Sequence, residues 1–173
     1  MTDMMKILCI EDEEVLREDL VEELTDAGYE VTYAKNGRSG HAAILDGTPD
    51  LVLCDVNMPD MNGFELLTTL RDNHPEHGDV PFIFLSALAD RKDIIAGKKL
   101  GADDYPTKPV DFELLLATVE SRLRQVQRMT ERKDEQLLRL YRALSENESP
   151  QPDSPTTTTT TTASAPTAEA APP

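Results

Sequence analysis

The stretch LVLCDVNMPDMNG, residues 51–63, decides the fold of this chain. Its first four residues are apolar and predict a buried strand. Asp55 ends that strand, just before a loop rich in proline, aspartate, asparagine and glycine. A carboxylate at the mouth of a buried strand is poorly explained by stability, because interior charge is costly unless it is compensated. Asp55 is therefore the first candidate for a functional residue.

Outward from this stretch, short apolar runs alternate with helical patterns over residues 5–123, which predicts a parallel sheet with helices on both faces. The strands are expected at Lys6–Ile10, Glu30–Ala34, Leu51–Cys54, Phe82–Leu85 and Asp104–Lys108, and the helices at Val15–Ala27, Arg38–Asp46, Gly63–Asn73, Asp90–Leu100 and from Phe112 onward. Apart from Lys6 at the start of the first, the first, third and fourth strands are apolar throughout, as expected of interior strands. The second is mixed, and the fifth contains Pro106, which suits an edge. Right-handed crossovers then give a five-stranded sheet of order 2-1-3-4-5.

Acidic side chains follow two interior strands of this predicted sheet. Glu11 and Asp12 come after the first strand, and Asp55 ends the third. The carboxyl ends of these strands meet where the strand order reverses, which is where open parallel sheets bind ligands. Mg²⁺ prefers oxygen ligands and takes one or two carboxylates. Asp12 and Asp55 are the expected carboxylate ligands, Glu11 is expected to act directly or through water, and the backbone carbonyl of Asn57 is a further candidate.

The remaining strand ends carry groups suited to phosphoryl transfer onto Asp55. Such transfer needs mainly positioning and charge neutralisation. Lys108, at the end of the fifth strand, would supply a cation, and Ser86, just beyond the fourth, would supply a hydroxyl donor. Each feature alone is commonly a loop starter or a helix cap. Four of them at four strand ends of one sheet predict a site in which Asp55, Ser86 and Lys108 do the chemistry.

Four sequence blocks carry a resemblance to a known family. They are ILCIEDE at 7–13, DVNMPDMNG at 55–63, LSA at 85–87, and GADDY at 101–105 followed by Lys108-Pro109. Together they resemble the receiver domain of two-component response regulators, the CheY-like superfamily, over about residues 5–123. The resemblance implies a flavodoxin-like (βα)5 fold. It also implies that Asp55 accepts a phosphoryl group from a histidine kinase or phosphotransfer protein, with Glu11 and Asp12 in the Mg²⁺ site.

The same resemblance implies that Ser86 and Lys108 contact the phosphoryl group and that Tyr105 is the aromatic side chain coupled to Ser86. Phosphorylation would then switch the face formed by the fourth helix, fifth strand and fifth helix. We expect no enzyme activity beyond phosphorylation and autodephosphorylation at Asp55. One alternative is an Mg²⁺-dependent phosphatase with an aspartyl-phosphate intermediate. It would need a second acid two residues after the nucleophile, where this chain has Asn57.

The last helix is predicted to run well past the sheet domain. Its apolar positions alternate in steps of four and three, which is the 3.5-residue period of a coiled coil. They are Phe112, Leu116, Val119, Leu123, Val126, Thr130, Lys133, Leu137, Leu140 and Leu144, with Thr130 and Lys133 interrupting the series. A homodimer through this helix is the favoured interpretation, and an amphipathic helix folded back on its own domain is the alternative. Thr118 stands where transcription factors of the family often carry an arginine for dimer contacts, which favours the helical extension.

Three regions are expected from this pattern: a receiver domain at 1–123, a helical extension at 124–147, and a disordered tail rich in proline, threonine and alanine at 148–173. A constitutive coiled-coil scaffold with an unused phosphorylation site remains a further alternative. So does a chain that has lost an output domain beyond the long helix.

The composition of the chain limits the classes of partner that it is expected to bind. The chain has 33 acidic against 17 basic residues and a formal charge of −16, which disfavours binding to nucleic acid or to an anionic membrane. No stretch approaches the roughly 20 apolar residues of a membrane span. Cys9 and Cys54 lie in strand-like runs and are expected to be reduced core thiols of a cytoplasmic protein.

Overall fold

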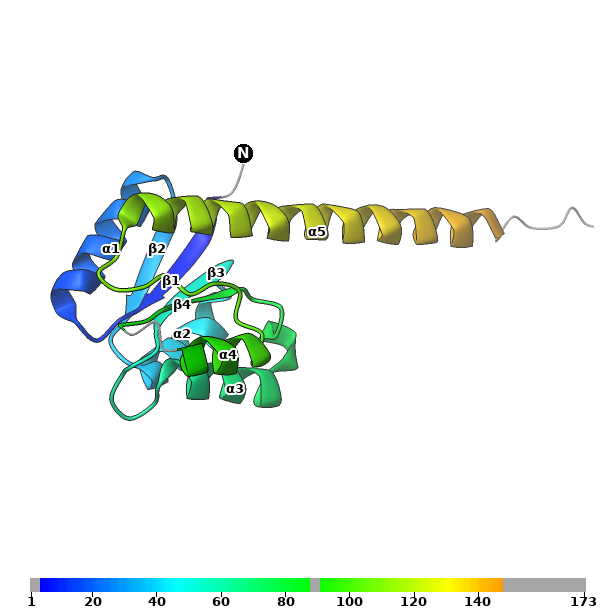
Figure 1. The fold of residues 1–173 in the computed structure, drawn as a ribbon. Helices are drawn as coiled ribbons and strands as arrows, with labels where there is room; N and C mark the ends of the chain where they lie inside the picture. Colours follow the sequence, from blue (N-terminus) through cyan, green and yellow to red (C-terminus); the bar gives the residue numbers. More distant parts are fainter. Residues whose placement is uncertain (1–3, 88–90, 148–173) are drawn as a thin grey trace, which may run out of the picture. The chain divides into compact units, whose positions relative to one another are not determined.

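The computed structural model describes residues 4–87 and 91–147. Strands and helices alternate along the chain, as the sequence predicts (Figure 1). In chain order the elements are β1 (Lys6–Ile10), α1 (Glu14–Asp26), β2 (Glu30–Ala34), α2 (Gly37–Gly47), β3 (Leu51–Asp55), α3 (Gly63–Asn73), the 3₁₀ turn η1 (Pro75–His77), β4 (Phe82–Leu85), α4 (Arg91–Lys99) and α5 (Phe112–Asn147).

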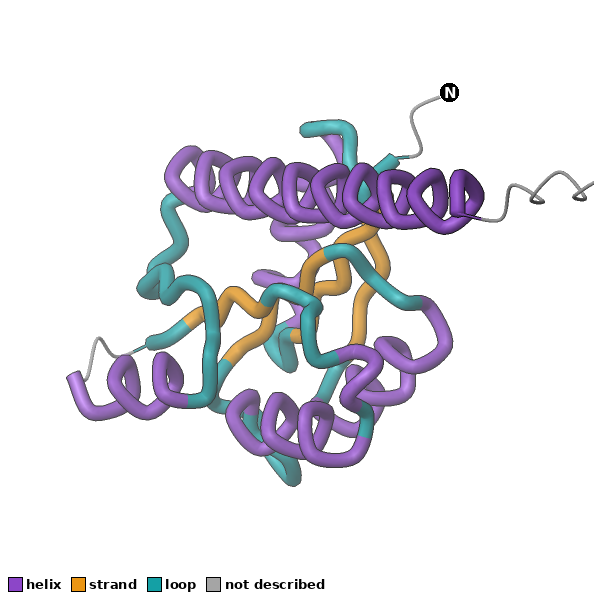
Figure 2. The backbone as a smooth tube through the Cα atoms, turned by 90° about the vertical axis from the view of Figure 1, so that its right-hand side faces the viewer, coloured by secondary structure: helices purple, strands orange, loops and turns teal. Residues whose placement is uncertain are grey.

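The strands form a parallel sheet of order β2-β1-β3-β4. Helix α1 and the first turns of α5 cover one face of the sheet, and α2, α3 and α4 lie on the other (Figure 1). Figure 2 shows the strands as a layer between these two groups of helices. This arrangement is the parallel sheet with helices on both faces that strand–helix alternation predicts, and it agrees with the flavodoxin-like fold that the family resemblance implies.

Alternate side chains of the interior strands enter two separate cores. In β3, Val52 and Cys54 pack with α2 and α3, whereas Leu51 and Leu53 pack with α1 and α5. Because successive side chains of a strand point to opposite faces, a strand covered on both sides must be apolar throughout. β4, β1 from Ile7 onward and β3 up to Cys54 meet this requirement, and it explains why Asp55, at the end of β3, stands out so clearly.

The predicted fifth strand is wrong. Over the described residues the sheet has four strands, and the segment 104–108 forms two isolated parallel bridges, from Asp104 to Ile83 of β4 and from Thr107 to Ser86 just beyond β4. Pro106 lies between the two bridges, and it has no N–H to donate to the neighbouring strand. Its carbonyl still accepts the N–H of Ser86 at 3.1 Å. The segment therefore runs beside β4 at the expected edge without forming a regular ladder.

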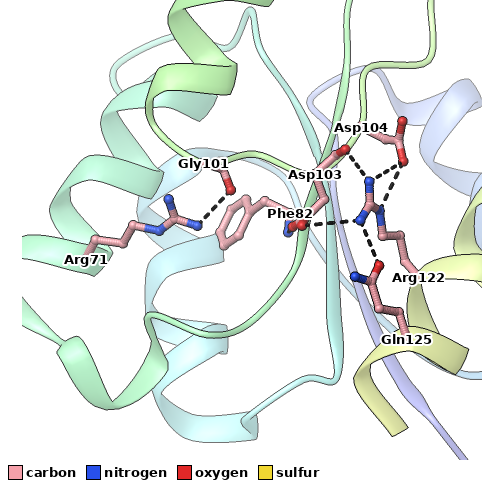
Figure 3. A network of polar contacts seen from close by, with 7 residues as sticks. All are labelled: Arg71, Phe82, Gly101, Asp103, Asp104, Arg122 and Gln125. Atoms are coloured by element: carbon pink, nitrogen blue, oxygen red, sulfur yellow. Dashed lines mark hydrogen bonds and ion pairs between the residues drawn. The ribbon is translucent and has the colours of Figure 1, made fainter. Parts of the chain in front are cut away.

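Side-chain contacts tie the start of this segment to α5 (Figure 3). The Arg122 guanidinium donates from Nε and Nη2 to the Asp104 carboxylate, both at 3.1 Å, and from Nη2 to the Asp103 carbonyl at 2.6 Å. The Asp103 carboxylate accepts the backbone N–H of Phe82, at the start of β4, at 2.9 Å. Arg122 thus connects α5 to the start of the segment that runs beside β4.

Helix α5 is continuous over the described residues, and the boundary between two compact units of the chain falls between Lys133 and Asp134. The predicted tail at 148–173 lies outside the described residues. Cys9 and Cys54 are buried and unpaired, and burial raises the pKa of the Cys9 thiol to about 12. Within 4–87 and 91–147, no helix combines the length and the apolar character that a membrane crossing requires.

Candidate functional site

Three acidic side chains meet at the carboxyl ends of β1 and β3. The parallel register pairs Ile10 with Cys54, so the residues that follow each strand lie beside one another. One carboxylate oxygen from each of Glu11, Asp12 and Asp55 lies within 4.8 Å of the others. Glu11 is fully buried and Asp55 is 3% exposed, whereas Asp12 is exposed. The structure therefore brings together the three acids that the sequence placed at these strand ends.

Lys108 completes the cluster from the segment beside β4. Its Nζ lies 2.9 Å from Oε2 of Glu11 and 3.2 Å from Oδ2 of Asp55. Its backbone N–H donates to the carbonyl of Ser86 at 2.8 Å, and Ser86 itself is buried at the end of β4. The bridge between β4 and this segment therefore places both Ser86 and Lys108 at the same edge of the sheet as Asp55.

The loop after Asp55 is held close to the strand end. The N–H of Asn57 donates to Oδ1 of Asp55 at 3.1 Å, and the N–H of Gly63 donates to the carbonyl of Val56 at 3.0 Å. A Cβ on Gly63 would lie only 2.6 Å from the Asp55 carbonyl oxygen, so this approach requires glycine. The loop sequence thus fixes the orientation of the Asp55 carboxylate through its own backbone.

Burial dominates the electrostatics of the cluster. It raises the pKa of the Glu11 carboxyl from an ordinary value of 4.5 to about 7, against hydrogen bonds from Lys108 and the Glu13 N–H that lower it. It also raises the pKa of Asp55, although the Lys108 charge and the Asn57 N–H oppose this. Burial alone would lower the pKa of Lys108, but its contacts with Glu11 and Asp55 outweigh burial and raise it. Lys108 therefore remains charged, but its single positive charge does not balance the negative charge of the ionised carboxylates.

A pH dependence of stability follows for the metal-free protein. Because the pKa of Glu11 is higher in the folded state, folding binds a proton between about pH 4.5 and about pH 7, and the free energy of unfolding falls as pH rises through this window. Glu11→Gln removes the ionisation. We expect it to gain about 2 kcal/mol of stability relative to wild type between about pH 5 and about pH 8, measured by urea unfolding with a chelator present.

Glu13→Gln is the matched control, since Glu13 is exposed and only its backbone N–H contacts Glu11. We expect its stability relative to wild type to stay constant over the same pH range. A difference between wild type and Glu11→Gln that does not change with pH would show that the buried carboxyl is not the group that titrates.

The cluster fits a hard divalent cation. The three carboxylates and the Lys108 ammonium leave two negative charges uncompensated when all four groups are ionised. Every potential ligand is an oxygen, which is the donor that Mg²⁺ prefers. Among the described residues this is also the one group of three or more acidic, histidine or cysteine side chains with suitable spacing. Glu11, Asp12 and Asp55 are therefore the residues that would hold Mg²⁺.

Tyr105 lies beside the site, between β4 and α4. Its ring centroid is 5.8 Å from that of Phe84, and its hydroxyl is buried without a hydrogen-bond partner among the described residues. A Cβ on Gly97 of α4 would overlap that hydroxyl, so the ring occupies a position that only a glycine leaves open. Burial raises the pKa of the Tyr105 hydroxyl to about 12.

Sequence reasoning missed two arginines that contact this region, Arg17 in α1 and Arg122 in α5. Arg17 donates from Nη1 to the backbone carbonyl of Glu11 at 2.9 Å. Neither residue stands out in the sequence, because both lie in helices rich in charged residues. The helical spacing of Arg17 could have indicated its burial. It stands three residues before Leu20 and seven before Leu24, both buried, so it lies on the inward face of α1.

Comparison with known proteins identifies the family. The model of the response regulator receiver domain matches residues 7–120. CusR of Escherichia coli K12, a transcriptional regulatory protein, is 39% identical over 120 residues, which are 69% of this chain and 52% of CusR. ArlR of Staphylococcus saprophyticus, a response regulator, is 39% identical over 121 residues, or 70% of this chain and 53% of ArlR. The chain spans about half the length of these curated relatives.

Solved structures agree with this assignment. The chemotaxis protein CheY4 of Vibrio cholerae is 33% identical with a TM-score of 0.65, over 68% of this chain and 98% of CheY4. A response regulator of Chloroflexus aurantiacus is 33% identical with a TM-score of 0.66, over 70% of this chain and 98% of that one. This chain belongs to the response regulator receiver domain family.

Proposed function

We propose that this chain is the response regulator of a two-component phosphorelay, in which Asp55 accepts a phosphoryl group from a histidine kinase or phosphotransfer protein. The observation that carries the proposal is the buried Asp55 carboxylate grouped with two further acids and a lysine. Three carboxylates at one sheet edge do not serve stability. Burial raises the pKa of both Glu11 and Asp55, which means that their ionised forms are disfavoured in the folded protein. Membership of the family supports the same proposal.

The protein groups have separate parts in this reaction. Asp55 is the nucleophile, and its carboxylate is oriented by the Asn57 N–H. The Lys108 ammonium, 3.2 Å from Asp55, is placed to neutralise an oxygen of the transferred group. Ser86 lies at the end of the adjacent strand and would donate its hydroxyl to another oxygen. When bound by the acids, Mg²⁺ supplies positive charge that offsets the charge of the phosphoryl oxygens.

Two measurements on the wild-type chain test this proposal. Calorimetry should show binding of Mg²⁺, and mass spectrometry should show a single phosphoryl adduct after incubation with a small acyl phosphate and Mg²⁺. The adduct should be absent when Mg²⁺ is removed by a chelator. If the chain takes up no Mg²⁺ and forms no adduct, the signalling role is wrong. Repeated hydrolysis of phosphate monoesters would instead indicate an enzyme, which we do not expect.

The output of the switch is proposed to pass through Tyr105. Movement of the Ser86 hydroxyl toward the phosphoryl group would vacate space beside the Tyr105 ring, which now occupies the gap above Gly97. A charge change at Asp55 would then alter the surface of α4, the segment 104–108 and α5. We propose that this surface binds partner proteins in the cytoplasm, and that the acidic chain itself binds neither nucleic acid nor membrane.

We further propose that the chain forms a homodimer through the later turns of α5. Leu137, Leu140 and Leu144 are 53%, 61% and 63% exposed, and they follow the heptad spacing predicted from the sequence. Leu137→Asp would place a charge in the middle of this seam. We expect it to weaken the dimer by about 100-fold or more, because each chain loses a buried leucine and would have to bury a carboxylate.

Leu138→Asp is the matched control. Leu138 is 57% exposed, close to the value for Leu137, but it lies off the heptad seam. Analytical ultracentrifugation over a range of concentrations should show a dimer for wild type and Leu138→Asp, and a monomer for Leu137→Asp. Equal effects of the two substitutions would rule out the seam, and the same experiment with beryllium fluoride and Mg²⁺ tests its dependence on phosphorylation.

A further inference from the structure

Four polar or charged side chains are buried among the described residues. Three of them, Glu11, Asp55 and Ser86, already belong to the proposed site, and the fourth is Arg17 of α1, which is 5% exposed. Arginine is rarely buried unless it is paired, so a reason is needed for its presence in the interior. Its buried hydrogen bond to the backbone of Glu11 links it to the acidic cluster.

The main contact of Arg17 is with the peptide that joins the two adjacent acids. Nη1 of Arg17 donates to the carbonyl oxygen of Glu11 at 2.9 Å, in a buried hydrogen bond. That carbonyl belongs to the peptide between Glu11 and Asp12. Two other bonds hold the turn: the Glu11 N–H donates to the Ala34 carbonyl at 3.2 Å, and the Glu13 N–H donates to Oε1 of Glu11 at 3.1 Å. Arg17 is thus the side chain that fixes the plane of the Glu11–Asp12 peptide.

Stability does not account for this arginine. Its nearest carboxylate is that of Glu14, at 4.0 Å and with a side chain 75% exposed, and such a pair contributes little. The guanidinium lies 5.5 Å from the ring centroid of Tyr33 on β2, a contact that offsets part of the cost of burial. An apolar side chain would fill the same space without that cost. What only a donor can supply is the bond to Glu11.

We propose that Arg17 is a positioning residue for the Mg²⁺ site, which it serves by holding the Glu11–Asp12 peptide in the orientation that brings both carboxylates toward Asp55. The inference rests on the proposed function, because it assigns a residue to the same site. Rotation of this peptide would move the Asp12 carboxylate most, since Asp12 is exposed whereas Glu11 is buried and paired with Lys108. Removing a hydrogen bond that orients a metal ligand, without touching the metal itself, commonly lowers metal affinity by about 10- to 100-fold.

The test compares Mg²⁺ affinity, by calorimetry, among variants at one position. Arg17→Met keeps the length of the side chain and removes every donor, and we expect it to raise the Mg²⁺ dissociation constant by about tenfold or more. Arg17→Lys keeps a charged donor and is expected to recover part of the affinity. Arg128→Met is the control: Arg128 is exposed on α5, and its replacement should leave the affinity unchanged. Thermal unfolding followed by circular dichroism confirms that each variant is folded.

A metal-free readout separates this inference from the proposed function. With a chelator present, hydrogen exchange of the Glu13 amide should be faster in Arg17→Met than in wild type, because that amide donates to the carboxylate of Glu11. Wild-type Mg²⁺ affinity in Arg17→Met, equal losses in the methionine and lysine variants, or unchanged exchange at Glu13 would each overturn the role of Arg17. Failure of the proposed function looks different, since wild type itself would then bind no Mg²⁺.

Discussion

Replacing Asp55 with asparagine is expected to abolish phosphoryl acceptance completely. The amide has the size of the carboxylate but is a far weaker nucleophile, and none of the neighbouring groups supplies a substitute. Glu11 is fully buried and held by Lys108 at 2.9 Å, and the Asn57 N–H that orients the acceptor donates to Asp55. Mass spectrometry after treatment with an acyl phosphate and Mg²⁺ should therefore show no adduct in Asp55→Asn.

Asp55→Asn should fold, so that loss of the adduct can be attributed to loss of the phosphoryl acceptor. Burial raises the pKa of Asp55, which means that its ionised form is disfavoured in the folded protein. A neutral amide removes that cost, although it also gives up an ion pair with Lys108. Circular dichroism should show a melting temperature close to that of wild type.

Asp60→Asn is the control for this experiment. Asp60 lies in the same loop, is exposed, and has a φ of 69°, a conformation that asparagine adopts readily. It should form the adduct as wild type does. An adduct of wild-type yield in Asp55→Asn would place the acceptor elsewhere and would overturn the proposed function.

The sequence predicted most of the sheet because its signals were local. β1, β3 and β4 contain short apolar runs that are directly followed by polar residues, and burial on both faces of a sheet requires such runs. Three acids at two of those ends could be placed together from strand order alone. The same reasoning put Lys108 at the edge of the sheet, where the structure has it within 3.2 Å of Asp55.

What the sequence could not predict depends on contacts between distant elements. The run 104–108 resembles a strand, but one proline is enough to reduce it to two bridges, and the arginine that holds its start comes from α5, 18 residues later. Arg17 presents the same difficulty. Its partner is a backbone carbonyl, which leaves no mark in the sequence, and its burial depends on how α1 packs against β2.

Lys108 should be the residue on which the stability of the metal-free site depends most. Its ammonium faces two buried carboxylates, 2.9 Å from Glu11 and 3.2 Å from Asp55. Lys108→Met keeps the aliphatic chain and leaves both acids without their cation. Breaking a buried pair in this way is expected to lower the free energy of unfolding by about 3 kcal/mol near neutral pH. Urea unfolding with a chelator present measures the loss.

Two conditions should remove this deficit. Lowering the pH protonates Glu11, whose pKa is already raised to about 7, so the variant should approach wild type toward about pH 5. Addition of Mg²⁺ should stabilise Lys108→Met more than wild type. A ligand that binds the folded state stabilises it more when its affinity is higher, and the variant site carries one more uncompensated negative charge. Combining Lys108→Met with Asp55→Asn should cost less than the sum of the single changes, since one of the two acids is then neutral.

Lys35→Met is the control for the loss of a lysine. Lys35 is exposed and follows β2, outside the cluster and outside α5, so its replacement should change stability by less than about 0.5 kcal/mol. The argument fails if Lys108→Met is as stable as wild type near neutral pH without metal, or if its deficit does not respond to pH. Either result would mean that the carboxylates at the ends of β1 and β3 are compensated by something other than this lysine, and the electrostatic basis for a cation site there would be lost.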